Sequence, residues 1–363
     1  MTNRRRILHL ITTIDRGGAE KQLLVLIRNQ ISIGQEVSVF FLKGRGELRD
    51  NLIDVGATVH QPHYKSFFGS IFDLKLLLEQ IKPEVVHAHL PRAEILARLL
   101  KCYRKSKFVV TRHNSEPFFP RLGHPVSAFL SQWVLRKAHR LICISEATRE
   151  FLMMHREVPA SRQKRTIVVK YGYDETFQLL ERKRDFDYII GTISRLTPQK
   201  NVQVQIEALG IIRQKSKSPW RLKIVGSGSL ESELRRKVQL LNLEEQVEFV
   251  GHVSDVRYAF SQFDIFVLSS FYEGFGLVLL EAMQNRVAIL ASNTSAIPEV
   301  LGTEYPGFFD PNHADQLADI ILRFESNQER SAMIQGYEQR LALFEPRHMT
   351  ENILEVYDLD LTI

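Results

Sequence analysis

The chain repeats one pattern in both halves: short runs of β-branched and apolar residues alternate with stretches of helical periodicity. One helical stretch is Ala19–Ile31, where Leu23, Leu26 and Ile27 share a face and Gly34 ends the pattern. Strands that alternate with helices predict an α/β fold with a mostly parallel sheet covered on both sides. The predicted strands are Ile7–Thr12, Glu36–Leu42, Val85–His89, Phe108–Arg112, Arg140–Ile144, Thr166–Val169, Tyr188–Ser194, Leu222–Val225, Val247–Val250, Ile265–Leu268 and Ala288–Ala291.

Two domains are expected, because 363 residues exceed what one hydrophobic core usually supports. The polar stretch 181–185 is predicted to link a Rossmann-like domain of residues 1–180 to another of residues 185–345. A last helix within 346–363 follows the second sheet and could equally pack back on the first domain. Doubly wound sheets bind ligands beyond the carboxyl ends of their strands. We therefore expect the two domains to face each other across a cleft that holds the site.

The charge divides unevenly along the chain. The net charge of +6 combines +15 in residues 1–184 (32 Lys and Arg against 17 Asp and Glu) with −9 in residues 185–363 (16 against 25). The basic first half favours an anionic surface or an anionic acceptor. Nucleic acid is the other anionic partner, but no nucleic-acid-binding motif accompanies the charge.

Basic and aromatic side chains interleave in the first half, which favours peripheral association with an anionic membrane surface. The alternative is a normal buried helix face, with Phe129 and Trp133 in the core four residues apart. Cys102 and Cys143 are widely spaced and fit a reduced compartment, so we expect a cytoplasmic protein at the inner face of the cytoplasmic membrane. The residues of this basic and aromatic region are Lys101, Arg104, Lys105, Lys107, Phe118, Phe119, Arg121, Phe129, Trp133, Arg136, Lys137 and Arg140.

A predicted strand-to-helix loop carries two basic residues, Arg195 and Lys200. The strand ends near Arg195, the chain turns at Pro198, and Asn201 is predicted to cap a helix over Val202–Leu209. Backbone N–H groups and the helix dipole favour an anion at such a position. Two cations there would suit a diphosphate, above all one that gains charge as it leaves.

A sharper motif follows the predicted buried strand Ile265–Leu268. Glu273 lies in a loop, Gly274-Phe275-Gly276 follows, and Glu281 lies about one turn inside the next helix. Glycines at a helix start let a ligand approach the backbone, so the pattern suggests phosphate recognition by amides and hydroxyl recognition by carboxylates. The paired carboxylates of a hydrolase are a weaker interpretation, because the helix start between the two acids suits an anion.

Together, Arg195 with Lys200-Asn201, Gly226-Ser-Gly228, and Glu273-Gly-Phe-Gly276 with Glu281 resemble the family 4 retaining glycosyltransferases (glycosyl transferases group 1), which have the GT-B fold. The resemblance extends over essentially the whole chain. The first half is similar to the family in a glycine loop around Gly17-Gly18 and in the segments 86–89, 111–113 and 144–148.

The resemblance implies a role for each matched residue. Arg195 and Lys200 would hold the donor diphosphate as it leaves, and Glu281 would bind the ribose hydroxyls. Glu273 and the backbone of Gly274, Phe275, Gly276 and Leu277 would contact the transferred sugar. Gly17 and Gly18 would approach the phosphates, and His113 would lie at the reaction centre. For His87 and His89 we expect a structural role, with one of them pointing inward.

The function that the resemblance implies is transfer of a hexose or N-acetylhexosamine from a nucleotide sugar, UDP favoured over GDP, to a saccharide acceptor. The first domain would bind the acceptor, expected to be lipid-linked, and the second domain the donor, in bacterial surface polysaccharide or glycoconjugate assembly. The family retains anomeric configuration. Two cations and helix dipoles would replace a divalent ion at the diphosphate, so we expect no metal and no other cofactor.

The chain departs from the family pattern at Tyr171-Gly-Tyr-Asp174, at Arg286 and Ala288, and at Ser295-Ala296, which leaves sugar and acceptor specificity open. One alternative function is a GT-B nucleotide-sugar epimerase, and another is a catalytically idle binding subunit. An oxidoreductase is a further alternative. It fits less well, because Glu231 stands where a dinucleotide fingerprint needs its third glycine.

Overall fold

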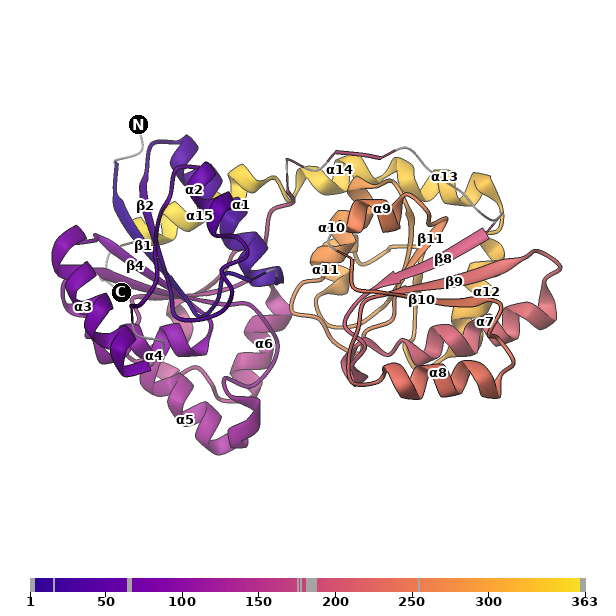
Figure 1. Ribbon diagram of the computed structural model, residues 1–363, viewed down its shortest axis with the longest axis horizontal. Coiled ribbons are helices and arrows are strands. Elements are labelled where there is room, and N and C mark those ends of the chain that lie inside the picture. Colours follow the sequence, from indigo (N-terminus) through magenta and orange to yellow (C-terminus); the bar gives the residue numbers. More distant parts are fainter. Residues whose placement is uncertain are drawn as a thin grey trace. The chain divides into compact units, whose positions relative to one another are not determined.

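The computed structural model describes residues 4–15, 17–63, 67–174, 176, 178–180, 188–253 and 255–359. The chain divides into two compact units, the first made of Met1–Asp174 and Phe344–Ile363 and the second of Glu175–Leu343. The predicted linker at 181–185 lies outside the described residues. Figure 1 shows a parallel sheet with flanking helices in each unit.

The first unit contains a seven-stranded sheet in the order β3-β2-β1-β4-β5-β6-β7, and every described strand pair is parallel. The chain starts in the middle, winds outward to β3, and then crosses back to β4 and on to the other edge. The strands are β1 (Arg6–Ile11), β2 (Glu36–Phe41), β3 (Thr58–His60), β4 (Val85–His89), β5 (Lys107–Arg112), β6 (Arg140–Cys143) and β7 (Thr166–Val168).

Helices cover both faces of this sheet (Figure 1). Helices α1 (Gly18–Ser32), α2 (Arg49–Asp54) and α15 (Pro346–Asp358) lie on one side. On the other side α3 (Phe67–Ile81), α4 (Pro91–Leu99), α5 (His124–Leu135) and α6 (Glu146–Met154) bury Leu74, Leu96, Val134 and Leu152 in one core. The 3-10 helices are η1 (Cys102–Arg104), η2 (Pro120–Leu122) and η3 (Ala160–Arg165).

The last helix, α15, belongs to the first unit although the chain reaches it from the second. It packs on α1, and its own side chains Met349, Ile353 and Tyr357 are buried. Lys107 Nζ donates to the Tyr357 carbonyl oxygen at 2.7 Å, which anchors the end of the helix to β5.

The second unit contains a six-stranded parallel sheet in the order β10-β9-β8-β11-β12-β13. Its strands are β8 (Tyr188–Ile193), β9 (Trp220–Val225), β10 (Val247–Gly251), β11 (Ile265–Leu268), β12 (Ala288–Ser292) and β13 (Phe308–Phe309). Its helices are η4 (Pro198–Lys200), α7 (Gln203–Lys215), α8 (Glu231–Leu240), α9 (Val256–Phe260), α10 (Leu277–Gln284), α11 (Ile297–Leu301), α12 (Ala314–Arg323), α13 (Asn327–Gln335) and α14 (Tyr337–Ala342).

The predicted fold class is confirmed, since both units are doubly wound parallel sheets. The predicted cap at Asn201 is wrong. Asn201 is left-handed (φ 47°), its side-chain amide donates to the Pro311 carbonyl oxygen at 2.7 Å, and α7 starts only at Gln203.

The basic and aromatic region of the first unit contains both exposed and packed aromatic residues. Phe129 is 63% exposed, so the core interpretation is wrong for it, whereas Trp133 packs under the Arg98 guanidinium, 4.6 Å from its ring centre. Among the described residues, no helix has the length and apolar character needed to cross a membrane.

Candidate active site

Arg195 and Lys200 lie in the loop that joins β8 to α7, at the carboxyl end of the sheet of the second unit. Arg195 is exposed, and Lys200 is half-buried at the end of η4. Ser269, the first residue after β11, donates from Oγ to the carbonyl oxygens of Lys200 and Asn201, 3.0 Å from each. The loops that follow two neighbouring strands are therefore tied together at the position where such sheets bind ligands.

Lys200 and Glu273 meet directly. Lys200 Nζ lies 2.5 Å from Glu273 Oε1, and Ser270 Oγ donates to the same oxygen at 2.6 Å. Ser295 Oγ donates to the Glu273 carbonyl oxygen at 2.8 Å. Because Glu273 is only 7% exposed and its side chain is held from two sides, the ammonium and the carboxylate have fixed positions.

Helix α10 begins beside this pair. Gly276 precedes its first residue, Leu277, with φ 89°, a conformation that favours glycine, and Phe275 is buried behind it. Gly276 has no side chain to cap the helix, so the amides at the start of α10 are donors for an anion. Glu281 follows one turn later and is half-buried, which agrees with its predicted place inside the helix.

The glycine loop after β9 lies against the loop of Arg195. Leu196 N donates to the Ser227 carbonyl oxygen at 2.9 Å, and Ser194 N donates to the Val225 carbonyl oxygen at 3.0 Å. The motifs around Arg195, Gly226-Ser-Gly228 and Lys200 with Glu273 are thus neighbours at one edge of the sheet. An anion at this edge would meet two cations and a helix start.

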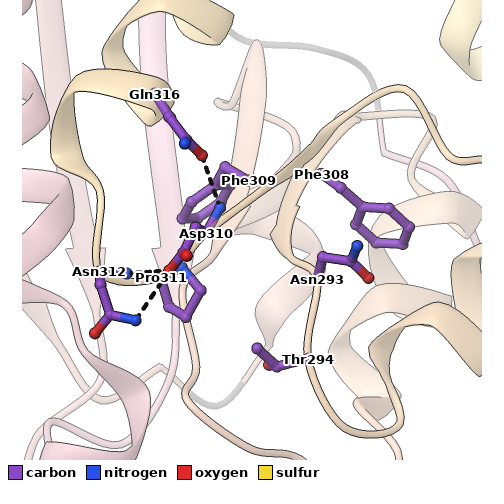
Figure 2. A pocket seen from close by; sticks show the side chains of 8 residues that line it. All are labelled: Asn293, Thr294, Phe308, Phe309, Asp310, Pro311, Asn312 and Gln316. Carbon is purple, nitrogen blue, oxygen red and sulfur yellow. Dashed lines mark hydrogen bonds between the residues drawn. The ribbon is translucent and has the colours of Figure 1, made fainter.

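A cavity of about 470 Å³ opens at the ends of β12 and β13, and no sequence motif indicated it (Figure 2). It adjoins the Lys200–Glu273 pair. Thr294 Oγ1 donates to the Ser270 carbonyl oxygen at 3.1 Å, and Pro311 accepts the bond from Asn201. Its lining residues are Asn293, Thr294, Phe308, Phe309, Asp310, Pro311, Asn312 and Gln316.

Asp310 is the one carboxylate among the residues that line this cavity. The Asn312 backbone N–H and side-chain amide donate to its Oδ1 at 2.8 and 2.9 Å, and these bonds lower the pKa of Asp310 below its usual value. Gln316 accepts a bond from the Asp310 backbone N–H at 3.2 Å. An ionised carboxylate and several amides suit a ligand that carries hydroxyl and N–H groups.

In the first unit, Gly17 precedes α1 in the turn that follows β1, and Gly18 is the first residue of α1. Thr13 Oγ1 donates to Glu20 Oε1 at 2.6 Å, so the side chain of Glu20 folds back over the loop. Burial raises the pKa of Glu20, and repulsion from Asp15 adds to this although the Thr13 bond opposes it. The predicted glycine loop is thus a strand-to-helix turn at the carboxyl edge of the first sheet.

His113 directly follows β5 and contacts two other side chains. Its Nε2 lies 3.0 Å from His89 Nδ1, and its Nδ1 is hydrogen-bonded to the Tyr171 hydroxyl. Burial and the neighbouring Arg112 guanidinium lower the pKa of His113 to about 3, so the imidazole is neutral. In the sequence, Tyr171 stood out only as a departure from the family pattern. The contact of Tyr171 with His113 was not predicted.

The expectation that only one of His87 and His89 points inward is wrong. Residues two apart in a strand share a face, so both side chains point the same way, and both are buried. His9 on the adjacent strand β1 pairs in register with His87 and is also buried. Burial lowers the pKa of His9 to about 4 and the pKa values of His87 and His89 well below their usual range.

Two known protein families match the chain. "Glycosyltransferase Family 4" matches residues 16–176, and "Glycosyl transferases group 1" matches residues 176–340. The first match covers the glycine loop and His113, and the second covers Arg195, Lys200, Glu273 and Glu281. The boundary between them coincides with the division of the structure into two units.

Curated relatives are glycosyltransferases. The chain is 23% identical to GalNAc-alpha-(1->4)-GalNAc-alpha-(1->3)-diNAcBac-PP-undecaprenol alpha-1,4-N-acetyl-D-galactosaminyltransferase of Campylobacter jejuni, over 97% of this chain and 98% of the relative. It is 29% identical to poly(ribitol-phosphate) alpha-N-acetylglucosaminyltransferase of Staphylococcus aureus, over 46% of this chain and only 34% of that longer relative.

A solved structure shows the same fold over nearly the whole chain. Anabaena HepE, whose crystal structure was determined in complex with UDP and glucose, superposes with a TM-score of 0.78 at 19% identity, over 98% of this chain and 100% of HepE. The two family descriptions cover the two parallel-sheet units, and this superposition extends across both of them. The chain therefore belongs to the family 4 (group 1) glycosyltransferases and has the GT-B fold.

Proposed function

We propose that the chain is a retaining hexosyltransferase. It moves a hexose or N-acetylhexosamine from a nucleotide sugar to a saccharide acceptor in bacterial surface polysaccharide or glycoconjugate assembly. The observation that carries the proposal is the Lys200–Glu273 pair at the start of α10. A cation and helix amides at that position suit the donor diphosphate, and the carboxylate suits the hydroxyls of the transferred sugar.

The relatives support the substrate class. The Campylobacter relative is named for an undecaprenol-linked acceptor, and Anabaena HepE was crystallised with UDP and glucose. We therefore favour a UDP-sugar over a GDP-sugar and a lipid-linked saccharide as acceptor. The cavity of about 470 Å³ beside Asp310 falls within the roughly 300–1,000 Å³ of typical small-molecule sites, so we propose that it takes part in donor binding next to the Lys200–Glu273 pair.

The proposed mechanism is front-face displacement. The acceptor hydroxyl oxygen bonds to the anomeric carbon on the face from which the diphosphate departs. The bond from that carbon to the phosphate oxygen breaks, and the hydroxyl proton passes to the departing phosphate. Arg195, Lys200 and the α10 amides stabilise the charge that develops on the diphosphate. His113 is proposed to bind hydroxyls at the reacting centre, and Gly17 and Gly18 to approach the phosphates.

We propose that the reaction needs no metal ion, because two cations and a helix start can supply the charge that a divalent ion would supply. Turnover in excess chelator, with the anomer of the product assigned by NMR, tests metal independence and retention together. Activity that chelator abolishes and Mn²⁺ or Mg²⁺ restores would contradict metal independence.

The first unit is proposed to bind an anionic membrane surface at the inner face of the cytoplasmic membrane. Its 600 Å³ cavity, between α3 and the segment that follows α4, is lined by five basic side chains and one acid, together with leucine, proline, cysteine and serine residues. Phe129, exposed on α5, is the apolar residue that would enter the lipid. The basic residues of the cavity are Lys75, Lys82, Lys101, Arg104 and Lys105.

Two other functions remain as alternatives: a nucleotide-sugar epimerase, which would use the donor without an acceptor, and an idle binding subunit, which would bind the donor without turnover. Transfer of sugar to an added acceptor, as opposed to isomerised donor or no product, separates the three functions.

Calorimetry with UDP, GDP, ADP and CMP tests the site. Arg195→Ala and Glu281→Ala are the informative variants, because Lys200→Ala would also leave Glu273 buried without its partner. We expect one nucleotide to bind selectively and each variant to weaken it about 10-fold or more. The exposed Arg236→Ala on α8 is the matched control. Unchanged affinity in both site variants would contradict the proposed site.

A further inference from the structure

Three buried histidines of the first unit, His9, His87 and His89, form a group to which the proposed reaction assigns no role. Their ring centres lie 4.2 to 5.3 Å apart, and none of the three side chains is more than 2% exposed. A lone core histidine usually bonds to backbone or to a single side chain. Here His9 bonds to His89, and His89 bonds in turn to His113.

The bonds form a linear series from Gln30 through His9, His89 and His113 to Tyr171, which we call the relay. Gln30 Oε1 lies 2.9 Å from His9 Nε2, and His9 Nδ1 lies 3.0 Å from His89 Nε2. His89 Nδ1 lies 3.0 Å from His113 Nε2, and His113 Nδ1 meets the Tyr171 hydroxyl. Both ring nitrogens of each histidine in this series are therefore engaged.

Neutral imidazoles carry one proton each, so all bonds in such a series must point the same way. The Gln30 side-chain amide nitrogen lies 3.4 Å from the Tyr357 hydroxyl, which leaves the Gln30 oxygen to accept from His9 Nε2–H. His9 Nδ1 then accepts from His89, and His89 Nδ1 accepts from His113. The Tyr171 hydroxyl donates to His113 Nδ1, so each histidine carries its proton on Nε2.

His87 belongs to a side branch that does not reach His113. Its Nδ1 lies 2.7 Å from the Tyr357 hydroxyl, and its Nε2 lies 2.6 Å from Thr111 Oγ1. The His87 ring packs on the His89 ring, and the nitrogens of both rings are hydrogen-bonded to other residues. Thr111 is therefore a control position: its hydroxyl bonds to the same cluster but lies outside the series.

The same three histidines have the composition of a metal site, since one ring nitrogen of each lies within 4.8 Å of the others. A metal would need a free lone pair on each ring. All six nitrogens of the three rings are already hydrogen-bonded, so bound metal would break several bonds of the series. The geometry favours hydrogen bonding over metal binding.

We propose that Gln30, His9, His89 and Tyr171 are positioning residues that hold His113 in one orientation and one tautomer. The consequence for the reaction rests on the proposed role of His113 as a hydroxyl-binding residue. With its proton on Nε2 and directed inward, His113 offers Nδ1 as an acceptor. A substrate hydroxyl that replaces the Tyr171 hydroxyl would donate to it.

NMR of the full chain with ¹⁵N-labelled histidine tests the relay without any substrate. The expected result is that His9, His89 and His113 stay neutral from pH 5.5 to 8.5 and share the Nε2–H tautomer. Gln30→Met removes the acceptor at the far end and should mix the tautomers of these residues. Thr111→Val, which removes a hydroxyl from the side branch only, should leave them unchanged. Mixed tautomers in the parent, or a stoichiometric metal in the purified protein, would overturn the relay.

Kinetics test whether the relay positions His113 for the reaction. Gln30→Met should lower kcat about 10-fold with little change in the KM for the donor, since a misplaced reactive group affects the transition state more than binding. Thr111→Val should keep kcat within about twofold of the parent. A relay confirmed by NMR with kcat unchanged in Gln30→Met would overturn the positioning role. A parent without any turnover would instead contradict the proposed function and leave the NMR result as the test of the relay.

Discussion

Arg112, next to His113, lies between two buried carboxylates. Its guanidinium nitrogens lie 2.9 Å from Glu94 Oε2 and 3.3 Å from Glu157 Oε2, and all three side chains are at most 5% exposed. One cation cannot neutralise two acids. Burial, together with repulsion from Glu157, raises the pKa of Glu94 to about 7 although Arg112 opposes the shift.

We predict that this group makes the first unit less stable as pH rises from about 4.5 to 7. The folded unit holds the Glu94 proton up to about pH 7, whereas the unfolded chain releases it near its ordinary pKa of 4.5. Between these values the folded state binds more protons, so the free energy of unfolding falls with pH, by about 3 kcal/mol over the range. Glu94→Gln should remove most of that slope.

The measurement is the urea midpoint of the first unit at pH 5 and pH 8, followed by the fluorescence of Trp133 in a Trp220→Phe background. Trp133 is the single tryptophan of that unit, because the chain has only these two. The exposed Glu150→Gln on α6 is the control and should keep the slope of the parent. Equal slopes in Glu94→Gln and the parent would show that Glu94 is ionised throughout.

At the scale of elements, the chain fixes the last helix to the first unit by a close approach of backbones. A Cβ on Gly172 would lie 2.6 Å from Pro346 Cα, at the start of α15. Tyr173 N donates to the Phe344 carbonyl oxygen at 2.9 Å in the same region. Any side chain at 172 must displace the start of α15. This helix packs on α1, and its Tyr357 hydroxyl is hydrogen-bonded to His87.

We predict that Gly172→Ala lowers the stability of the first unit by about 1–3 kcal/mol, the usual cost of overpacking. The same Trp133 fluorescence and urea titration measure it. The matched control is Gly210→Ala inside α7, where the added Cβ meets side chains at an ordinary 3.8 Å and alanine favours the helix. Followed by Trp220 in a Trp133→Phe background, that variant should be neutral or slightly stabilised. No loss in Gly172→Ala would mean that α15 has room to shift.

The elements themselves were largely predictable from the sequence. Uninterrupted apolar runs such as Ile265–Leu268 coincide with strands, because a buried parallel strand needs side chains that are apolar on both faces. The edge strands Thr58–His60 and Phe308–Phe309 were missed, since two or three residues show no periodicity. Asn201 was predicted as a cap from local preference, but a carbonyl distant in sequence, that of Pro311, binds its side chain instead.

The candidate site was predictable only where a motif is local. Gly274-Phe-Gly276 with Glu281 lies within one strand–loop–helix segment, so its spacing was informative. The Lys200–Glu273 pair and the His9–His89–His113 series join residues far apart in sequence, and strand order rather than spacing brings them together. Tyr171, Gln30 and the cavity beside Asp310 depend on the same strand order, and no local pattern pointed to them.

At the scale of the whole molecule, the division into two units coincides with the division of charge along the chain. The basic residues that line the 600 Å³ cavity all belong to the first unit, and the second half of the chain carries the excess of acids. An anionic surface would therefore attract the first unit and repel the second. Phe129, 63% exposed on α5, would add an apolar contact to that attraction.

We predict that the protein floats with vesicles that contain anionic lipid and not with neutral vesicles, and that high salt releases it. Lys101→Ala with Lys105→Ala should weaken binding roughly 30-fold, because each basic residue near such a surface contributes about 1 kcal/mol. Leu240→Gln is the control: Leu240 is 72% exposed, but it lies on α8 in the acidic half of the chain. Its binding should equal that of the parent. Absence from both kinds of vesicle would contradict membrane association. Equal binding to both kinds would contradict an electrostatic origin and assign the affinity to the exposed apolar residues alone.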